Sequence, residues 1–90
     1  MKRYLIERNI AGVGNLNREQ LKGAAATSNK ALANLVGTVQ WVQSFVAEDK
    51  TFCIYLAEGE EAVHEHARMS GFPASRVTEL RGIIDPMTAA

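Results

Sequence analysis

Residues 39–57 read VQWVQSFVAEDKTFCIYLA, and this stretch decides the fold. Segments 39–47 and 51–57 are rich in β-branched and aromatic side chains, show no helical period, and flank the short polar turn Glu48-Asp49-Lys50. Two such segments around a tight turn predict a β-hairpin. The rest of the chain is therefore expected to build on a pair of antiparallel strands.

On either side of the hairpin, the hydrophobic periodicity and the helix start and stop residues predict two helices and two further strands. Asn17 and Gln20 have the spacing of a capping box, and a small-residue stripe follows them as far as Gly37. The predicted elements are a strand over 2–8, a helix from Asn17 to Gly37, a helix over 60–70 and a strand over 76–84. The resulting order, βαββαβ, predicts an α+β ferredoxin-like fold with two helices on one face of an antiparallel sheet.

Length, composition and charge predict a single globular domain and exclude several classes of partner. Ninety residues leave room for a single domain over 1–90, and 47% hydrophobic with 22% charged residues is globular composition. Lys+Arg and Asp+Glu are equal at 10 each, so we expect no nucleic-acid partner. No apolar run approaches the roughly 20 residues that span a bilayer, and no signal-peptide core is present, so we expect no membrane partner and a cytoplasmic location.

One face of the predicted sheet is left without a helix. Side chains alternate between the two faces of a strand, and this alternation predicts that the helix-facing set is Val42, Val46, Phe52, Ile54 and Leu56. The open face is then expected to hold Leu5, Glu7, Trp41, Gln43, Phe45, Cys53, Tyr55, Val77, Glu79, Arg81 and Ile83. An aromatic-rich patch of this kind predicts a homodimer with face-to-face sheets, a dimeric α/β barrel. Its polar residues either bond across the interface or line a ligand pocket.

The two histidines are the strongest chemical signal. His64 and His66 point roughly 200° apart on a helix, so one helix cannot offer both to one metal ion. His66 lies on the inner stripe and is either a hydrogen-bonded core residue or a metal ligand or acid–base group. His64 follows Glu60 by four residues, a spacing that brings the two side chains together on a helix. The two residues form either a solvated pair or a surface metal site. The lone thiol of Cys53 is either a small apolar filler or a ligand.

Two common patterns are excluded. Gly12-Val13-Gly14 would need a third glycine at position 17 to complete a dinucleotide-binding loop, and Asn17 stands there. No nucleophile elbow places a serine, histidine and aspartate as a catalytic triad.

Several short motifs together resemble one known pattern. They are Glu7-Arg8, Trp41-Val42-Gln43-Ser44-Phe45, Asp49-Lys50, Cys53, Tyr55, Glu61-Ala62, Glu65-His66-Ala67, Gly71-Phe72-Pro73-Ala74, Arg76-Val77, Ile84-Asp85-Pro86 and Thr88-Ala89. Over nearly its whole length the chain resembles a family of small bacterial proteins of unknown function, labelled nickel-responsive or nickel-binding. The resemblance implies a ferredoxin-like dimer and makes His66 the first candidate ligand, whereas a site that depends on His64 would be particular to this protein.

Two main functions follow as hypotheses. The first is a small dimeric transition-metal-binding protein without turnover, with nickel first and zinc or copper as alternatives, because imidazole and carboxylate ligands suit all three. Its candidate ligands are His66, His64, Glu60 and Cys53. The second is a small-molecule-binding protein or cofactor-free enzyme with a pocket between the two sheets of the dimer. That pocket would be lined by Glu7, Trp41, Gln43, Tyr55, Glu79 and Arg81. A third hypothesis is a dimer with no site.

Overall fold

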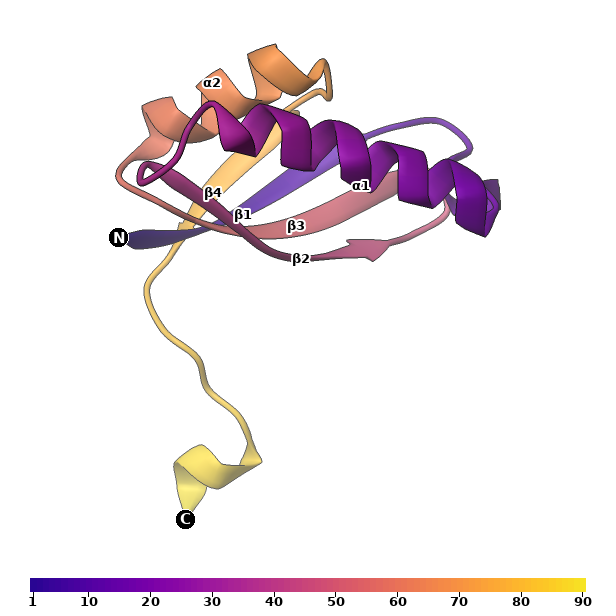
Figure 1. The fold of residues 1–90 in the computed structure, drawn as a ribbon. Helices are drawn as coiled ribbons and strands as arrows, with labels where there is room; N and C mark the ends of the chain where they lie inside the picture. Colours follow the sequence, from indigo (N-terminus) through magenta and orange to yellow (C-terminus); the bar gives the residue numbers. More distant parts are fainter.

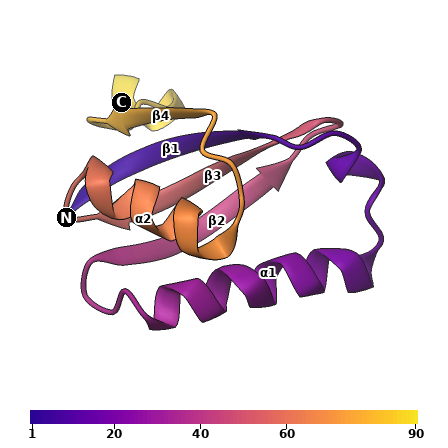
Figure 2. The ribbon, with the colours of Figure 1, turned by 90° about the horizontal axis from the view of Figure 1, so that it is seen from above.

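Four antiparallel strands form one sheet in the order β2-β3-β1-β4 in the computed structural model, which describes residues 1–90. The strands are β1 (Lys2–Asn9), β2 (Val39–Val46), β3 (Lys50–Ala57) and β4 (Arg76–Leu80). The helices are α1 (Arg18–Ala33) and α2 (Glu60–Ser70), with short 3-10 turns at Val13–Asn15 and Pro86–Ala89. Both helices cover the same face of the sheet (Figures 1 and 2), so the predicted α+β ferredoxin-like arrangement is confirmed. Neither helix combines the length and hydropathy needed to cross a membrane.

The helix boundaries follow from their end residues. The Asn17 side chain accepts from the backbone of Gln20, and the Gln20 side chain accepts from the backbone of Asn17, both at 2.9 Å, so the predicted capping box is present. α1 ends at Ala33, earlier than predicted, and Gly37 turns the chain toward β2 with a φ of 86°. α2 ends at Ser70 and is followed by Gly71, which adopts the left-handed conformation typical of the residue after a helix.

The face assignment predicted for β3 is wrong. Thr51, Cys53, Tyr55 and Ala57 are buried beneath the helices, while Phe52, Ile54 and Leu56 lie on the open face. Both faces of this strand carry mostly apolar side chains, so alternation alone does not identify the face that points toward the helices. The tyrosine decides it, because its hydroxyl finds a polar partner, Ser28, only under α1.

A β-bulge in β2 explains a second error. Trp41 pairs with Tyr55, whereas Gln43 pairs with Ile54, so Val42 is an extra residue and the alternation reverses there. Trp41 therefore shares the helix-covered face with Tyr55. Gln43 and Phe45 lie on the open face, as predicted.

The outer strand also differs from the prediction. Opposite Ile6 and Tyr4 of β1, Val77 and Glu79 share the helix-side face, not the open one. β4 ends at Leu80. Residues 81–90 leave the sheet as an exposed tail, which projects from the face that the helices do not cover (Figure 1). Arg81 and Ile83 are thus not part of the sheet.

Candidate functional site

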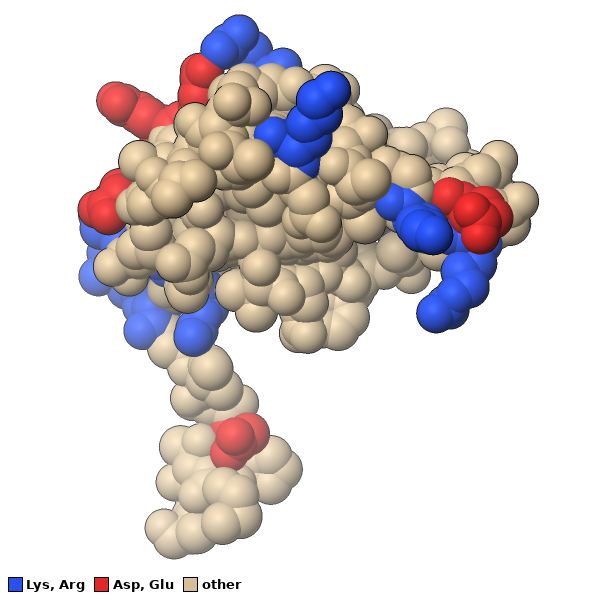
Figure 3. Space-filling view, in the orientation of Figure 1, with Lys and Arg blue, Asp and Glu red and all other residues tan.

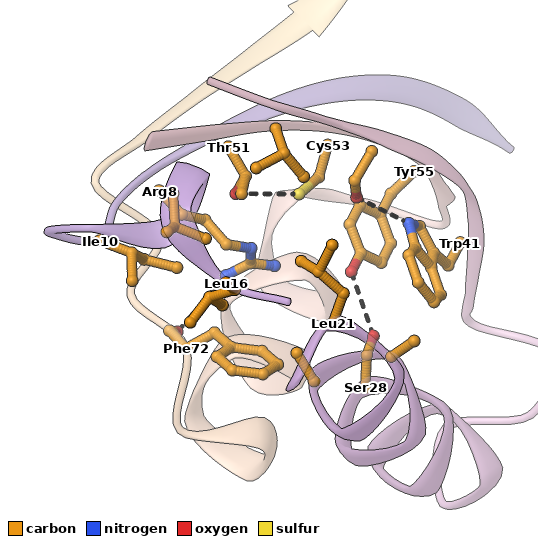
Figure 4. A pocket seen from close by; sticks show the side chains of 15 residues that line it. Arg8, Ile10, Leu16, Leu21, Ser28, Trp41, Thr51, Cys53, Tyr55 and Phe72 are labelled. Carbon is orange, nitrogen blue, oxygen red and sulfur yellow. Dashed lines mark hydrogen bonds between the residues drawn. The ribbon is translucent and has the colours of Figure 1, made fainter. Parts of the chain in front are cut away.

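A cavity of about 240 Å³ lies between α1, the sheet and the loop that follows β1. Its apolar walls come from separate elements: Val13 and Leu16 from the loop, Leu21 from α1, Trp41 from β2, and Phe72 from the segment after α2 (Figure 4). Elements from distant parts of the chain therefore line one small hydrophobic space.

The side of the cavity next to α2 holds a hydrogen-bonded polar group. The Ser28 hydroxyl lies 3.4 Å from the Tyr55 hydroxyl and 3.2 Å from Nε2 of His66. The Tyr55 and His66 rings contact one another, with centroids 5.1 Å apart. All three side chains are buried, and Nδ1 of His66 has no partner.

Burial sets the charge of these groups. It raises the pKa of Tyr55, although the bond to Ser28 and the nearby positive charge of Arg8 act in the opposite direction. Burial lowers the pKa of His66, and the positive charge of Arg8 lowers it further. Tyr55 and His66 are therefore neutral near pH 7.

Arg8 is the one charged residue in the cavity wall. It is only 3% exposed, its Nη1 donates to the carbonyl oxygens of Pro73 at 2.8 Å and Phe72 at 3.4 Å, and its guanidinium carbon lies 5.8 Å from the centre of the Tyr55 ring. Arg8 is not among the site residues predicted from the sequence. Its position two residues after Ile6, on the buried face of β1, is the signal that would have found it.

The predicted metal ligands lie in two separate places. Nε2 of His64 is 3.5 Å from Oε2 of Glu60 on the exposed side of α2. His66 is 1% exposed on the opposite side of that helix, and Cys53 is buried in the cavity wall, with Sγ 3.5 Å from Oγ1 of Thr51. Nowhere does the chain bring together three or more histidine, cysteine, aspartate or glutamate side chains that could hold a metal ion.

The residues predicted to line a between-sheet pocket are also divided. Glu7 lies on the open face, with its carboxylate 3.4 Å from Lys50 and 3.9 Å from Arg76, and Gln43 shares that face. Trp41 and Tyr55 lie on the helix side and line the cavity there. Glu79 and Arg81 lie together at the sheet edge, beside Lys2.

Comparisons with known proteins agree on fold and family. The family model described as "Nickel responsive protein SCO4226-like" matches residues 4–80. The crystal structure of SCO4226 from Streptomyces coelicolor A3(2) matches with a TM-score of 0.75 at 16% identity, covering 91% of this chain and 99% of that chain, so the two share a fold. A search of curated proteins finds no significant match. Since the family model spans most of its length, the chain belongs to the SCO4226-like family of nickel-responsive proteins.

Proposed function

We propose that this protein is a small nickel-binding protein that acts by binding, without turnover, and holds the metal on the exposed side of α2. The observation that carries the proposal is the contact between Nε2 of His64 and the carboxylate of Glu60, 3.5 Å apart, with 53% and 58% of the two side chains exposed. A histidine nitrogen and a carboxylate oxygen suit Ni(II), and equally Zn(II) and Cu(II). The family description gives nickel the first place.

The number of donors limits how such a site would work. One chain supplies two donors at this position, and Glu61, the next residue of the same turn, is also exposed. Solvent reaches the pair, so water would occupy the remaining positions around the metal. With so few protein ligands, losing either His64 or Glu60 removes half of the protein donor set, and binding should respond strongly to both changes.

We also propose that the protein is a homodimer formed through the open face of the sheet. Phe45 is 56% exposed there and pairs with Phe52, and Leu5 and Ile54 on the same face are, like Phe52, partly exposed. An apolar patch of this kind is normally covered by a partner. Because both helices occupy the other face, the two α2 helices of such a dimer would lie on its outer sides, and each chain would bind its own nickel ion.

The cellular location that we propose is the cytoplasm. Cys53 is a free thiol, the chain's single cysteine, and it is buried. A protein without disulfides suits a reducing compartment.

Isothermal titration of NiCl₂ into tag-free protein tests the metal proposal. Parent protein should bind nickel, His64→Ala and Glu60→Gln should weaken binding at least tenfold, and His66→Ala and Cys53→Ala should leave it unchanged. Equal affinity in the parent and the two α2 variants, or no binding by the parent, would overturn the proposal. A loss confined to His66→Ala or Cys53→Ala would instead place the metal at the buried residues. Parallel titrations with zinc and copper salts rank the three metals.

A second candidate function, binding or cofactor-free conversion of a small molecule, is favoured by the cavity beneath α1. Trp41 and Tyr55, the predicted aromatic walls of a pocket between two sheets, lie in that cavity instead. Cavities that combine apolar walls with a few polar groups are the usual places for such ligands. We therefore place the small-molecule alternative on the helix side of the sheet.

A further inference from the structure

The charge of Arg8 has no counter-ion in the folded chain. Arg8 is only 3% exposed, and none of the ion pairs in the protein involves it. Two carbonyl oxygens accept from Nη1, but Nη2 has no hydrogen-bond partner at all. A buried, unpaired charge with an unsatisfied donor is strongly unfavourable, so such groups are normally paired.

Arg8 is the one charged residue among those that line the cavity. In Figure 4 its guanidinium lies in the interior of the pocket, between Leu16 and the Tyr55 ring. Tyr55 adds no negative charge, because burial raises its pKa, and the remaining walls are mostly hydrophobic. The cavity is thus an apolar space with one fixed positive charge.

We propose that this cavity binds a small apolar monocarboxylate, whose carboxylate pairs with Arg8 and whose hydrocarbon part packs against Leu16, Leu21 and Trp41. A planar carboxylate matches the fork of donors on a guanidinium. An apolar body matches walls that come almost entirely from aliphatic and aromatic side chains. This site is separate from the nickel site proposed on α2, so either can exist without the other.

The volume restricts the size of the ligand. A cavity of roughly 150 Å³ already accommodates benzene, and drug-sized ligands occupy roughly 300–1,000 Å³. The cavity, at about 240 Å³, lies between these limits. It suits one aromatic ring with a short acid chain, or a short to medium fatty acid.

The chain's single tryptophan provides a direct test, because Trp41 lines the cavity. Its fluorescence is followed while phenylpropionate or octanoate is added, with EDTA present so that no metal takes part. Phenylpropanamide and octanamide serve as uncharged ligands of the same shape. We expect one or both acids to bind at least tenfold more tightly than the matching amide, the difference that one charge-assisted bond provides. The two acids distinguish an aromatic ligand from a fatty acid.

Arg8→Met and Arg3→Met form a matched pair of variants. Both lie on β1, but Arg3 pairs with Leu56 on the open face. Arg8→Met should reduce acid binding to the level of the amide, and Arg3→Met should keep the preference. Acid and amide binding equally to parent protein, or no fluorescence response to either acid at millimolar concentration, would overturn the proposal. The acid–amide comparison uses the parent protein alone, so it holds even if Arg8→Met folds poorly.

Discussion

Ser28 joins the two helices to the sheet through one hydroxyl. It is 4% exposed and lies within hydrogen-bond distance of both Tyr55 and His66. Within the small-residue stripe of α1, a serine allows close packing and also satisfies two buried polar groups that an alanine would leave with fewer partners.

Removing the Ser28 hydroxyl tests its contribution to the stability of the fold. Ser28→Ala should lower the free energy of unfolding by about 1–3 kcal/mol, because it removes the hydroxyl that partners the buried Tyr55 hydroxyl and Nε2 of His66. Thr27→Ala is the control, since Thr27 is exposed and bonds only to the backbone of its own helix. Urea unfolding followed by Trp41 fluorescence measures both. An equal change in the two variants would contradict the assigned role of Ser28.

His66 should make the protein less stable in acid. Its pKa in the folded chain lies below the ordinary value of 6.5, because burial and the charge of Arg8 disfavour the protonated ring. As the pH falls below about 6.5, the unfolded chain takes up a proton that the folded chain resists, so the free energy of unfolding decreases until the lowered pKa is reached. Above about 6.5 this group contributes no pH dependence.

Urea unfolding between about pH 7.5 and about pH 5.5, with EDTA present, checks this expectation. His66→Gln should lose part of the acid-induced decrease that the parent shows. His64→Gln should keep it, because His64 is exposed on the other side of α2. A parent and His66→Gln with the same pH dependence would show that His66 is not the responsible group.

At the scale of elements, the loop after β1 is attached to the β2–β3 turn at several points. The backbone N–H of Gly14 donates to the carbonyl of Glu48 at 2.8 Å, and that of Gly12 donates to Oδ1 of Asp49 at 2.8 Å. A Cβ on Gly14 would lie 2.6 Å from the carbonyl oxygen of Ala47, too close for the backbone to remain in place. The glycines that look like part of a phosphate loop in the sequence thus serve packing, and they position Val13 and Leu16 in the cavity wall.

Two glycine substitutions with opposite expected signs test this attachment. Gly14→Ala should lower the free energy of unfolding by about 1–3 kcal/mol, because neighbouring backbone must move. Gly23→Ala should raise it by about 0.5–1 kcal/mol, because Gly23 lies within α1 with nothing near its missing Cβ. Thermal or urea unfolding of both variants measures the difference. A neutral Gly14→Ala would mean that the loop is not held against the turn.

Element order and most element ends could be predicted because their signals are local. The capping pair Asn17 and Gln20 and the helix stop at Gly71 depend only on neighbouring residues. The inner face of β3 depends on packing, since both of its faces are apolar, and the bulge at Val42 has no local sequence signal. The site could not be predicted for the same reason. Arg8 is recognised as a site residue only once the structure shows that it lies among α1, the sheet and Phe72.

At the scale of the whole molecule, uncovered apolar surface lies on the open face of the sheet and on the tail. Ile83 and Ile84 are 70% and 87% exposed on residues 81–90. In the space-filling view, the end of this tail carries one acidic side chain and no lysine or arginine (Figure 3), and Asp85 is the acidic residue of this segment. A second copy docked on the open face would lie on the side toward which the tail extends (Figure 1).

A charge placed on the open face should therefore separate the chains. Phe45→Lys is expected to convert a two-chain particle into single chains, because a lysine would be buried without a partner at the interface. Val36→Lys is the control, as Val36 is 83% exposed between α1 and β2, away from that face. Sedimentation velocity at micromolar concentration distinguishes the two. Single chains in the parent protein would contradict the proposed dimer.

Native mass spectrometry of tag-free protein loaded with nickel tests the central claim most directly, because it counts chains and metal ions in one particle. The account predicts two chains with one nickel ion per chain, and a His64→Ala particle that still has two chains but no nickel. Nickel retained in full by His64→Ala, or a parent particle that carries none, would contradict it.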